Sequence, residues 1–354
     1  MRMNLLIMFL FGASISLTAC TSPAEEPQKP TGQQPPNEPD DSNDGDGQPA
    51  PVYGHLTIEN TVKDVIEHEA FVGFGKFILP AERRYDYNMP LANVASLLPY
   101  HNYVTGERAV ETINTMIDYV QDGNRLFYDI YSDEDKRTDA RKNNTGLFFF
   151  RGKPGKPFAI VCPGGGFSYV GAIHEGFPLA IALSEMGYNA FSIQYRTGGA
   201  QVACEDLAQA IDFIMRHAEE LQVSAEDYSL WGGSAGARMA AYLGSYSTQG
   251  FINATHKRPA TVIMGYTGHS EYTPNDPPTY VIIGEDDAIA SPATMRRRVE
   301  NLQALGINAE FHLLPNLRHG FGLGRGTTAD GWHKNAVKFW EKYISRKNGT
   351  SYRK

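Results

Sequence analysis

Residues 230–237 read LWGGSAGA and contain the pattern G-x-S-x-G around Ser234. The pattern alone is weak, because this chain is rich in glycine and the spacing also occurs by chance. Its context makes it informative: residues 228–232 are strand-like, and a good helix former follows from Ala235 onward. A sharp turn between strand and helix would expose the Ser234 hydroxyl, and the helix N-terminus behind it would favour negative charge. This stretch therefore predicts a nucleophilic serine.

A serine nucleophile needs a base, and the base needs an orienting carboxylate. His319 is the preferred base, because it lies in the Gly-flanked loop NLRHGFG directly after a predicted strand. His312 falls inside that strand pattern and His333 opens the last helix. A structural role is therefore expected for both of them rather than that of the catalytic base.

The acid is expected after the preceding strand, where residues 285–287 read Glu-Asp-Asp. Asp287 fits a G-x-x-D turn that begins at Gly284, which favours it over Asp286, and Glu285 fits least. A solvated acidic turn is the alternative interpretation of the same run.

The order of the elements predicts an α/β fold. From residue 125 onward, short β-rich runs alternate with helical patterns, which is typical of a mostly parallel twisted sheet with helices on both faces. The first two strands are joined by a polar stretch, residues 132–145, which predicts a loop and an antiparallel start. The predicted strands are residues 126–131, 146–151, 158–162, 190–195, 228–232, 261–264, 280–283 and 309–314. The predicted helices are residues 108–121, 177–186, 202–220, 236–244, 292–305 and 330–345.

The order Ser234, Asp287, His319 resembles that of the α/β-hydrolase fold over residues 125–346. Within that fold, the motifs CPGGGF, WGGSAGA and RHGFG are similar to those of bacterial acetyl-xylan-esterase-like and feruloyl-esterase-like hydrolases. The resemblance implies a serine esterase that removes short acyl groups, acetate above all, from plant polysaccharide such as xylan. It implies neither a cofactor nor a metal.

The glycine run at residues 164–166 has two interpretations, a phosphate cradle or an oxyanion hole. No lysine follows the glycines and no dinucleotide-binding spacing appears, which argues against phosphate. The resemblance implies that backbone amides of Gly165, Gly166 and Ala235 form the oxyanion hole. Cys162-Pro163 stands where many lipases and esterases carry histidine, so any catalytic contribution of that histidine in those enzymes cannot be transferred to this chain.

The N-terminus indicates export and lipidation. Residues 1–19 pair Arg2 with an apolar run and small residues, as in a secretory signal, and the segment ends in Leu-Thr-Ala before Cys20, which resembles a bacterial lipobox. Residues 20–51 begin with Cys20, which the lipobox predicts to be lipidated. The segment is Pro-rich and acidic, which predicts a flexible tether. The expected location is the bacterial cell envelope, with membrane contact through the lipid alone.

Charge excludes nucleic acid as the expected partner. Residues 21–51 hold seven acids against one lysine, Arg2 adds one positive charge, and residues 52–354 therefore carry −3 of the total −8. A near-neutral folded part without a basic cluster does not suit a polyanion. Cys162 and Cys204 lie in apolar patterns and are expected as buried thiols.

Two segments flank the predicted catalytic domain. Residues 52–124 hold an aromatic cluster that includes Tyr100, His101 and Tyr103. They form a cap or a sugar platform, or they pack against the core, and packing is favoured. Residues 347–354 are a tail.

A feruloyl esterase, a serine peptidase of the prolyl-oligopeptidase type and a non-catalytic binding lipoprotein remain alternatives. A metal-dependent deacetylase is disfavoured, because neither H-E pair in the chain continues into H-E-x-x-H.

Overall fold

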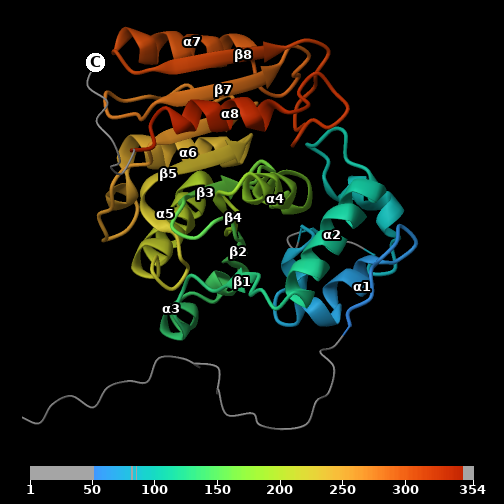
Figure 1. The fold of residues 1–354 in the computed structure, drawn as a ribbon. Coiled ribbons are helices and arrows are strands. Elements are labelled where there is room, and N and C mark those ends of the chain that lie inside the picture. The colour runs from blue at the N-terminus through green and yellow to red at the C-terminus, as the bar shows by residue number, and fades with distance from the viewer. Residues whose placement is uncertain (1–51, 81–82, 85, 346–354) are drawn as a thin grey trace, which may run out of the picture. The chain divides into compact units, whose positions relative to one another are not determined.

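The computed structural model describes residues 52–80, 83–84 and 86–345, and these residues all belong to one compact unit (Figure 1). The predicted signal, the tether with Cys20 and the tail lie outside the described residues. None of the described helices is both long and apolar enough to cross a membrane.

An eight-stranded sheet runs through this unit in the order β1-β2-β4-β3-β5-β6-β7-β8. The pairs β1–β2 and β2–β4 are antiparallel and the remaining pairs are parallel, which confirms the predicted α/β-hydrolase sheet with its antiparallel start. The strands are β1 (Phe127–Tyr128), β2 (Gly146–Phe150), β3 (Pro157–Cys162), β4 (Asn189–Gln194), β5 (Ser224–Gly233), β6 (Thr261–Gly265), β7 (Thr279–Gly284) and β8 (Ala309–Leu314).

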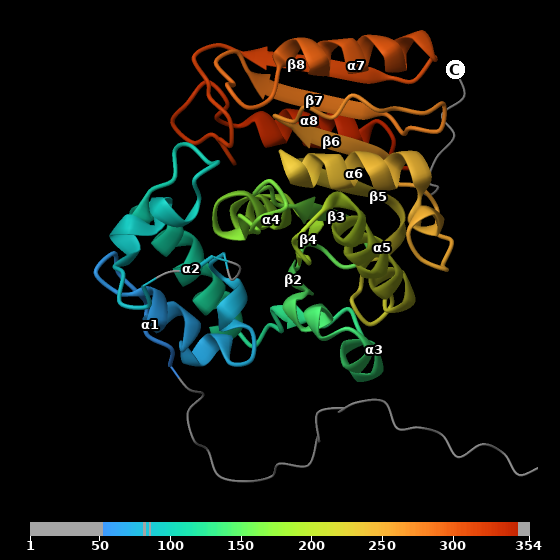
Figure 2. The same cartoon turned by 180° about the vertical axis from the view of Figure 1, so that it is seen from behind.

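Helices cover both faces of the sheet. α8 lies on the near face in Figure 1, whereas α5 and α6 lie on the near face in Figure 2, which shows the opposite side. The α-helices are α1 (Val62–Ile66), α2 (Gly106–Gln121), α3 (Asp133–Thr138), α4 (Phe177–Glu185), α5 (Ala200–Arg216), α6 (Ala235–Tyr246), α7 (Pro292–Ala304) and α8 (Trp332–Glu341). Short 3₁₀ turns are η1 (Glu69–Phe71), η2 (Gly75–Phe77), η3 (Leu91–Leu97), η4 (Ala140–Asn144) and η6 (Thr248–Gly250), and η5 (Ala172–Gly176) is a π-helical turn.

The expectation that residues 132–145 form a loop is wrong. The segment contains α3 and η4, although no side chain of either is buried. α3 begins at a capping box in which Ser132 and Asp135 bond each other's backbone amides, which satisfies two otherwise free N–H groups. A one-and-a-half-turn helix without an apolar face leaves no hydrophobic periodicity to detect.

Residues 52–124 pack on the hydrolase core through aromatic side chains. The Phe74 ring stacks on Phe127 of β1 with centroids 5.2 Å apart, and its edge meets Phe148 of β2 at 5.8 Å. In both ribbon views this blue-to-cyan segment lies beside α4, and α2 contacts η5, the turn that leads into α4 (Figures 1 and 2). The segment thus reaches the same end of the molecule as the loops that follow the parallel strands.

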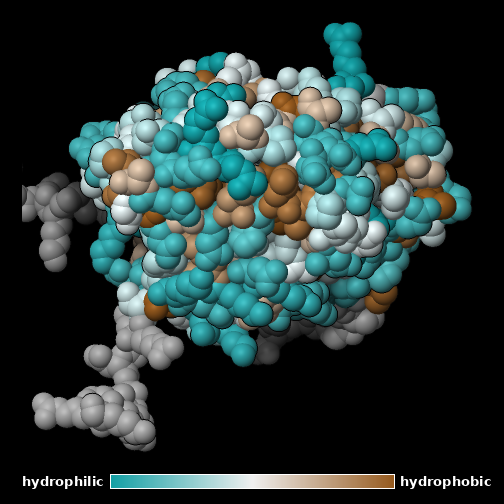
Figure 3. Space-filling model, turned by 90° about the horizontal axis from the view of Figure 1, so that it is seen from above, coloured by the Kyte–Doolittle hydropathy of each residue, from teal (hydrophilic) through white to brown (hydrophobic). Residues whose placement is uncertain are grey.

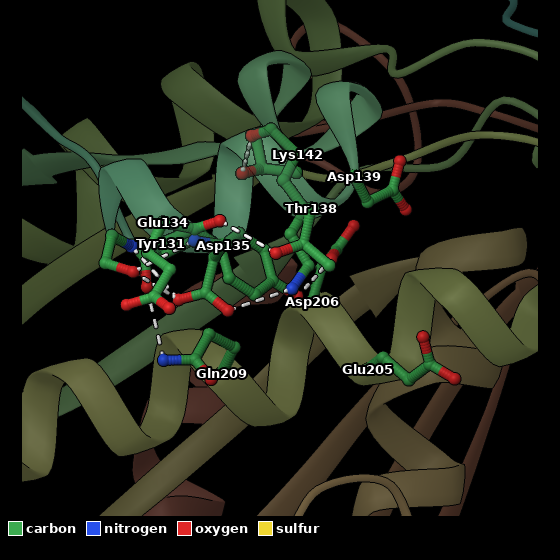
Figure 4. Close-up of polar contacts among 12 residues, drawn as sticks. Tyr131, Glu134, Asp135, Thr138, Asp139, Lys142, Glu205, Asp206 and Gln209 are labelled. Atoms are coloured by element: carbon green, nitrogen blue, oxygen red, sulfur yellow. Dashed lines mark hydrogen bonds and ion pairs between the residues drawn. The ribbon is translucent and has the colours of Figure 1, made fainter.

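A buried charged network fixes the antiparallel start to α5. The Asp206 carboxylate accepts hydrogen bonds from the Tyr131 hydroxyl (2.6 Å) and from the Arg196 backbone amide (2.6 Å) and guanidinium (Nε, 2.9 Å). Arg196 also pairs with Asp139 at 3.0 Å. Gln209 of α5 donates to the backbone beside Tyr131 (Figure 4). Asp206 is fully buried, so these donors are what make its burial tolerable.

On the face seen from above in Figure 3, hydrophilic residues surround smaller groups of hydrophobic ones. Such a mixed surface is ordinary for a folded protein, because scattered apolar side chains need no partner.

Candidate active site

The candidate nucleophile sits at the join of β5 and α6. Ser234 has φ 52° and ψ −116°, a backbone conformation that L-residues seldom adopt. A β-carbon added at Gly236 would collide with the carbonyl of Cys162, so the close approach of α6 to the end of β3 requires glycine there. The G-x-S-x-G pattern thus forms the predicted sharp turn, at a cost in backbone strain.

The structure brings Ser234, His319 and Asp287 together. His319 Nε2 lies 2.9 Å from Ser234 Oγ, and His319 Nδ1 lies 2.8 Å from Asp287 Oδ2. Asp287 Oδ1 accepts the backbone amides of Ile289 and Ala290 at 2.9 and 2.7 Å, which fixes the carboxylate in its turn. The His319 and Asp287 side chains are buried, with 3% and 0% exposure.

The other candidates lie apart from this arrangement. Glu285 and Asp286 are exposed on the same turn. The His312 ring stacks on Tyr280 of the neighbouring strand, with centroids 4.3 Å apart, and His333 is buried in α8. Of the alternatives that the sequence left open, the structure therefore brings Asp287 and His319 next to Ser234 and leaves the others apart.

The glycine-rich turn after β3 passes over Ser234. A β-carbon added at Gly164 would lie 2.9 Å from Cβ of Ser234. In the described part of the chain, the amides of Gly165, Gly166 and Ala235 have no hydrogen-bond acceptor. Ala235 is also the first residue of α6, where unpaired N–H groups and the helix dipole favour an anion.

A buried polar cluster that sequence reasoning missed lies beneath this turn. Glu175 of η5 accepts the amide of Gly164 and the hydroxyl of Tyr266 (2.8 Å), and its Oε1 lies 3.0 Å from His101 Nε2. Burial opposes ionisation of Glu175, but His101 and these hydrogen bonds outweigh it and lower its pKa to about 2. The Tyr266 ring also packs edge-on against the His319 ring, with centroids 5.1 Å apart.

A second missed feature is the contact of residues 100–103 with the same loops. The Asn102 side-chain amide donates to the carbonyl of His319 at 2.7 Å, and the Arg318 amide donates to the Tyr103 hydroxyl at 3.1 Å. The only available signal was the polar and aromatic composition of that stretch, which did not indicate what it contacts.

Within residues 52–80, 83–84 and 86–345, no group of three or more His, Cys, Asp or Glu side chains is arranged to hold a metal ion. Cys162 and Cys204 are both free and buried, and burial raises the pKa of each thiol.

Part of the chain matches a known family model. The model of the BD-FAE family, an esterase type within the α/β-hydrolases, matches residues 151–262, a range that includes the glycine-rich turn and Ser234. No curated protein matches the chain.

Solved structures resemble the chain at low identity. The acetyl ester-xyloside bifunctional hydrolase from Caldicellulosiruptor lactoaceticus has a TM-score of 0.54 and 19% identity, over 62% of this chain and 97% of that chain. The carboxylesterase Cest-2923 from Lactobacillus plantarum WCFS1 has a TM-score of 0.49 and 20% identity, over 56% of this chain and 92% of that chain. The sheet topology and the structural likeness show that the chain has the α/β-hydrolase fold, and residues 151–262 resemble an esterase-type family within that fold.

Proposed function

We propose that this protein is a serine carboxylesterase that works through an acyl-enzyme. The observation that carries the proposal is the unbroken series of hydrogen-bond contacts from Ser234 Oγ through the His319 ring to the Asp287 carboxylate. A binding protein has no need of a buried base held between a strained serine and a buried acid.

Acylation begins when Ser234 Oγ attacks the ester carbonyl carbon and its proton passes to His319 Nε2. The carbonyl π electrons move onto oxygen, and in this proposal the backbone amides of Gly165, Gly166 and Ala235 stabilise that oxyanion. One such donor is worth about 3–4 kcal/mol of transition-state stabilisation. Collapse of the intermediate expels the alcohol, which takes the proton from His319.

Deacylation repeats these steps with water. His319 removes a proton from the water, the resulting hydroxide attacks the acyl carbon, and Ser234 leaves with the proton that His319 returns. Asp287 stays ionised throughout, orients the ring through Nδ1 and stabilises the imidazolium.

Comparison of the wild type with Ser234→Ala tests this function. The wild type should hydrolyse p-nitrophenyl acetate and be labelled covalently by a fluorophosphonate, and the variant should do neither. Retention of more than a few per cent of wild-type activity by the variant would exclude Ser234 as the nucleophile.

We further propose acylated carbohydrate as the substrate, with acetylated xylan as the leading case. The proposal rests on the sequence resemblance and on Tyr100, which is 43% exposed and whose ring lies against Gly166 of the glycine-rich turn. The Tyr100 ring stacks on Tyr169 with centroids 5.7 Å apart, so its orientation is fixed by packing. Exposed aromatic rings offer an apolar face to a sugar.

A substrate panel with a Tyr100→Ala variant tests the substrate class. Acetylated xylan should be hydrolysed faster than feruloylated arabinoxylan or short peptides. Tyr100→Ala should raise KM for acetylated xylan several-fold and leave hydrolysis of p-nitrophenyl acetate within about twofold. Preference for feruloylated substrate or for peptide would instead indicate a feruloyl esterase or a peptidase.

The location in the cell envelope is also a proposal, because Cys20 lies outside the described residues. Acyl chains on Cys20 would hold the protein at a membrane, since each buried methylene contributes about 0.8 kcal/mol. Cys20→Ala should therefore release soluble protein, and continued membrane association of that variant would place the anchor elsewhere.

A further inference from the structure

Residues 100–103 belong to the N-terminal segment, yet they lie between the two loops that complete the candidate active site. The His101 side chain is 1% exposed, and its Nδ1 lies 2.9 Å from the hydroxyl of Tyr169, which follows the glycine-rich turn. Its other nitrogen lies 3.0 Å from Glu175. Asn102, the next residue, holds the backbone of His319.

The Glu175 carboxylate accepts hydrogen bonds from the amide of Gly164 and the hydroxyl of Tyr266. Its Oε1 also lies within ion-pair distance of the ring nitrogen of His101, at 3.0 Å. A carboxylate only accepts, so it suits all three neighbours when each presents a proton. A glutamine keeps one acceptor oxygen, and its NH₂ group either faces the amide of Gly164 or requires Tyr266 or His101 to become an acceptor. Glu175 is 3% exposed, and water therefore cannot replace a lost partner.

The bond to Gly164 fixes the start of the glycine-rich turn. Because that amide faces Glu175, the peptide plane before the turn has one orientation, and the amides of Gly165 and Gly166 follow from it. Those two amides are unpaired among the described residues, and they directly follow Gly164, which lies against Ser234. A preorganised oxyanion hole depends on such orientation, because its donors act without reorganising during the reaction.

We propose that Glu175 and His101 are positioning residues that hold the oxyanion loop of this enzyme in its catalytic orientation. The N-terminal segment then supplies part of the active-site framework, because His101 lies within it. This inference rests on the esterase function proposed above.

The test compares three variants by steady-state kinetics on p-nitrophenyl acetate, per folded molecule. Glu175→Gln is isosteric and should lower kcat about 10- to 100-fold with KM within about threefold, since the oxyanion exists only in the transition state. His101→Ala should lower kcat similarly, and His101→Gln, which restores an N–H donor, should recover part of the loss. The fluorophosphonate labelling rate should fall in parallel, because that adduct is also tetrahedral.

Asp276→Asn is the matched control. Asp276 pairs with Arg298 at 2.7 Å, both side chains are 1% exposed, and neither contacts the triad or the glycine-rich turn. This variant should unfold at lower urea concentration and keep the wild-type kcat. Glu175 stays charged well below neutral pH, so Glu175→Gln should lower the whole pH–rate profile without moving its acid limb.

The inference would be overturned if folded Glu175→Gln and His101→Ala both kept the wild-type kcat and lost only unfolding free energy, as Asp276→Asn should. The proposed function would survive that result. A wild-type protein that neither hydrolyses esters nor labels at Ser234 would instead remove the function on which the inference rests.

Discussion

The backbone strain at Ser234 can be measured as a difference in stability between two variants. A residue at φ 52° and ψ −116° carries steric strain that glycine would not carry. Ser234→Ala and Ser234→Gly should both be inactive, but the glycine variant should be more stable than the alanine variant by about 1 kcal/mol or more. Urea unfolding of the two variants measures the difference. Equal stabilities would show that the turn relaxes when the hydroxyl is removed.

The acidic run offers a test of one residue against its neighbour. Asp287→Asn should lower kcat by about 10³- to 10⁴-fold, because the amide cannot stabilise the imidazolium and favours the wrong tautomer of His319. Asp286→Asn should change kcat less than about twofold, since Asp286 is exposed. Steady-state kinetics of both variants settles the assignment, and a crippled Asp286→Asn with an active Asp287→Asn would reverse it.

At the residue level, the sequence singled out residues that the structure brings together where chemistry and local pattern coincide. Ser234, Asp287 and His319 each stand in a recognisable turn directly after a strand, and the fold brings those strand ends together. Glu175 and His101 lie 74 positions apart, and each has an unremarkable local pattern. Their role depends on their being buried next to each other in the fold, which the sequence around each residue does not indicate.

At the level of elements, the predicted bounds of every strand except β1 and β5 lie within one residue of the observed bounds. β3 and β7 are buried along their whole length and appear as apolar runs in the sequence. β4 is equally buried, although it carries Asn189, Ser192 and Gln194. β5 begins four residues before its predicted start, at Ser224, because its first four residues are only partly buried and carry polar side chains. Short polar elements such as α3 are stabilised by capping residues and charged partners. Hydrophobic periodicity does not reveal such interactions.

The network at α5 predicts a stability effect without a catalytic one. Asp206→Asn should lower the unfolding free energy by about 3 kcal/mol, because it removes the fully buried anion of Arg196 and leaves that guanidinium only the partly exposed Asp139 and Glu205. Glu205→Gln is the control: Glu205 lies 3.3 Å from the same guanidinium but is 32% exposed, so its loss should cost less than about 1 kcal/mol. Urea unfolding checks both, and kcat per folded molecule should be unchanged in each.

For the whole molecule, buried histidines predict a loss of stability in mild acid. Burial, with His101 nearby, lowers the pKa of His174 to about 4, and burial, with Arg298 nearby, lowers that of His269 to about 3. In the unfolded chain both titrate near 6.5, so below that pH the unfolded state binds more protons. Each histidine should remove about 1.4 kcal/mol of unfolding free energy per pH unit as the pH falls from 6.5 towards 4.

Urea unfolding between pH 6.5 and 5 measures this slope. That window isolates the histidines, because Glu175 contributes a loss in the same direction only below its unfolded pKa near 4.5. His269→Gln should reduce the slope by the share of one histidine. An unfolding free energy that does not change across the window would contradict the prediction.

The contact between Asn102 and the backbone of His319 also determines how late in the synthesis of the chain the active site can be completed. The two residues are 217 positions apart, and His319 is made 85 positions after Ser234. At ribosomal rates of about 5–20 residues per second, residues 100–103 leave the ribosome roughly ten to forty seconds before the loop that they hold. The segment made first must therefore wait for one made almost last, and an unfinished chain contains a serine without its base. Such a chain cannot hydrolyse esters during its own synthesis.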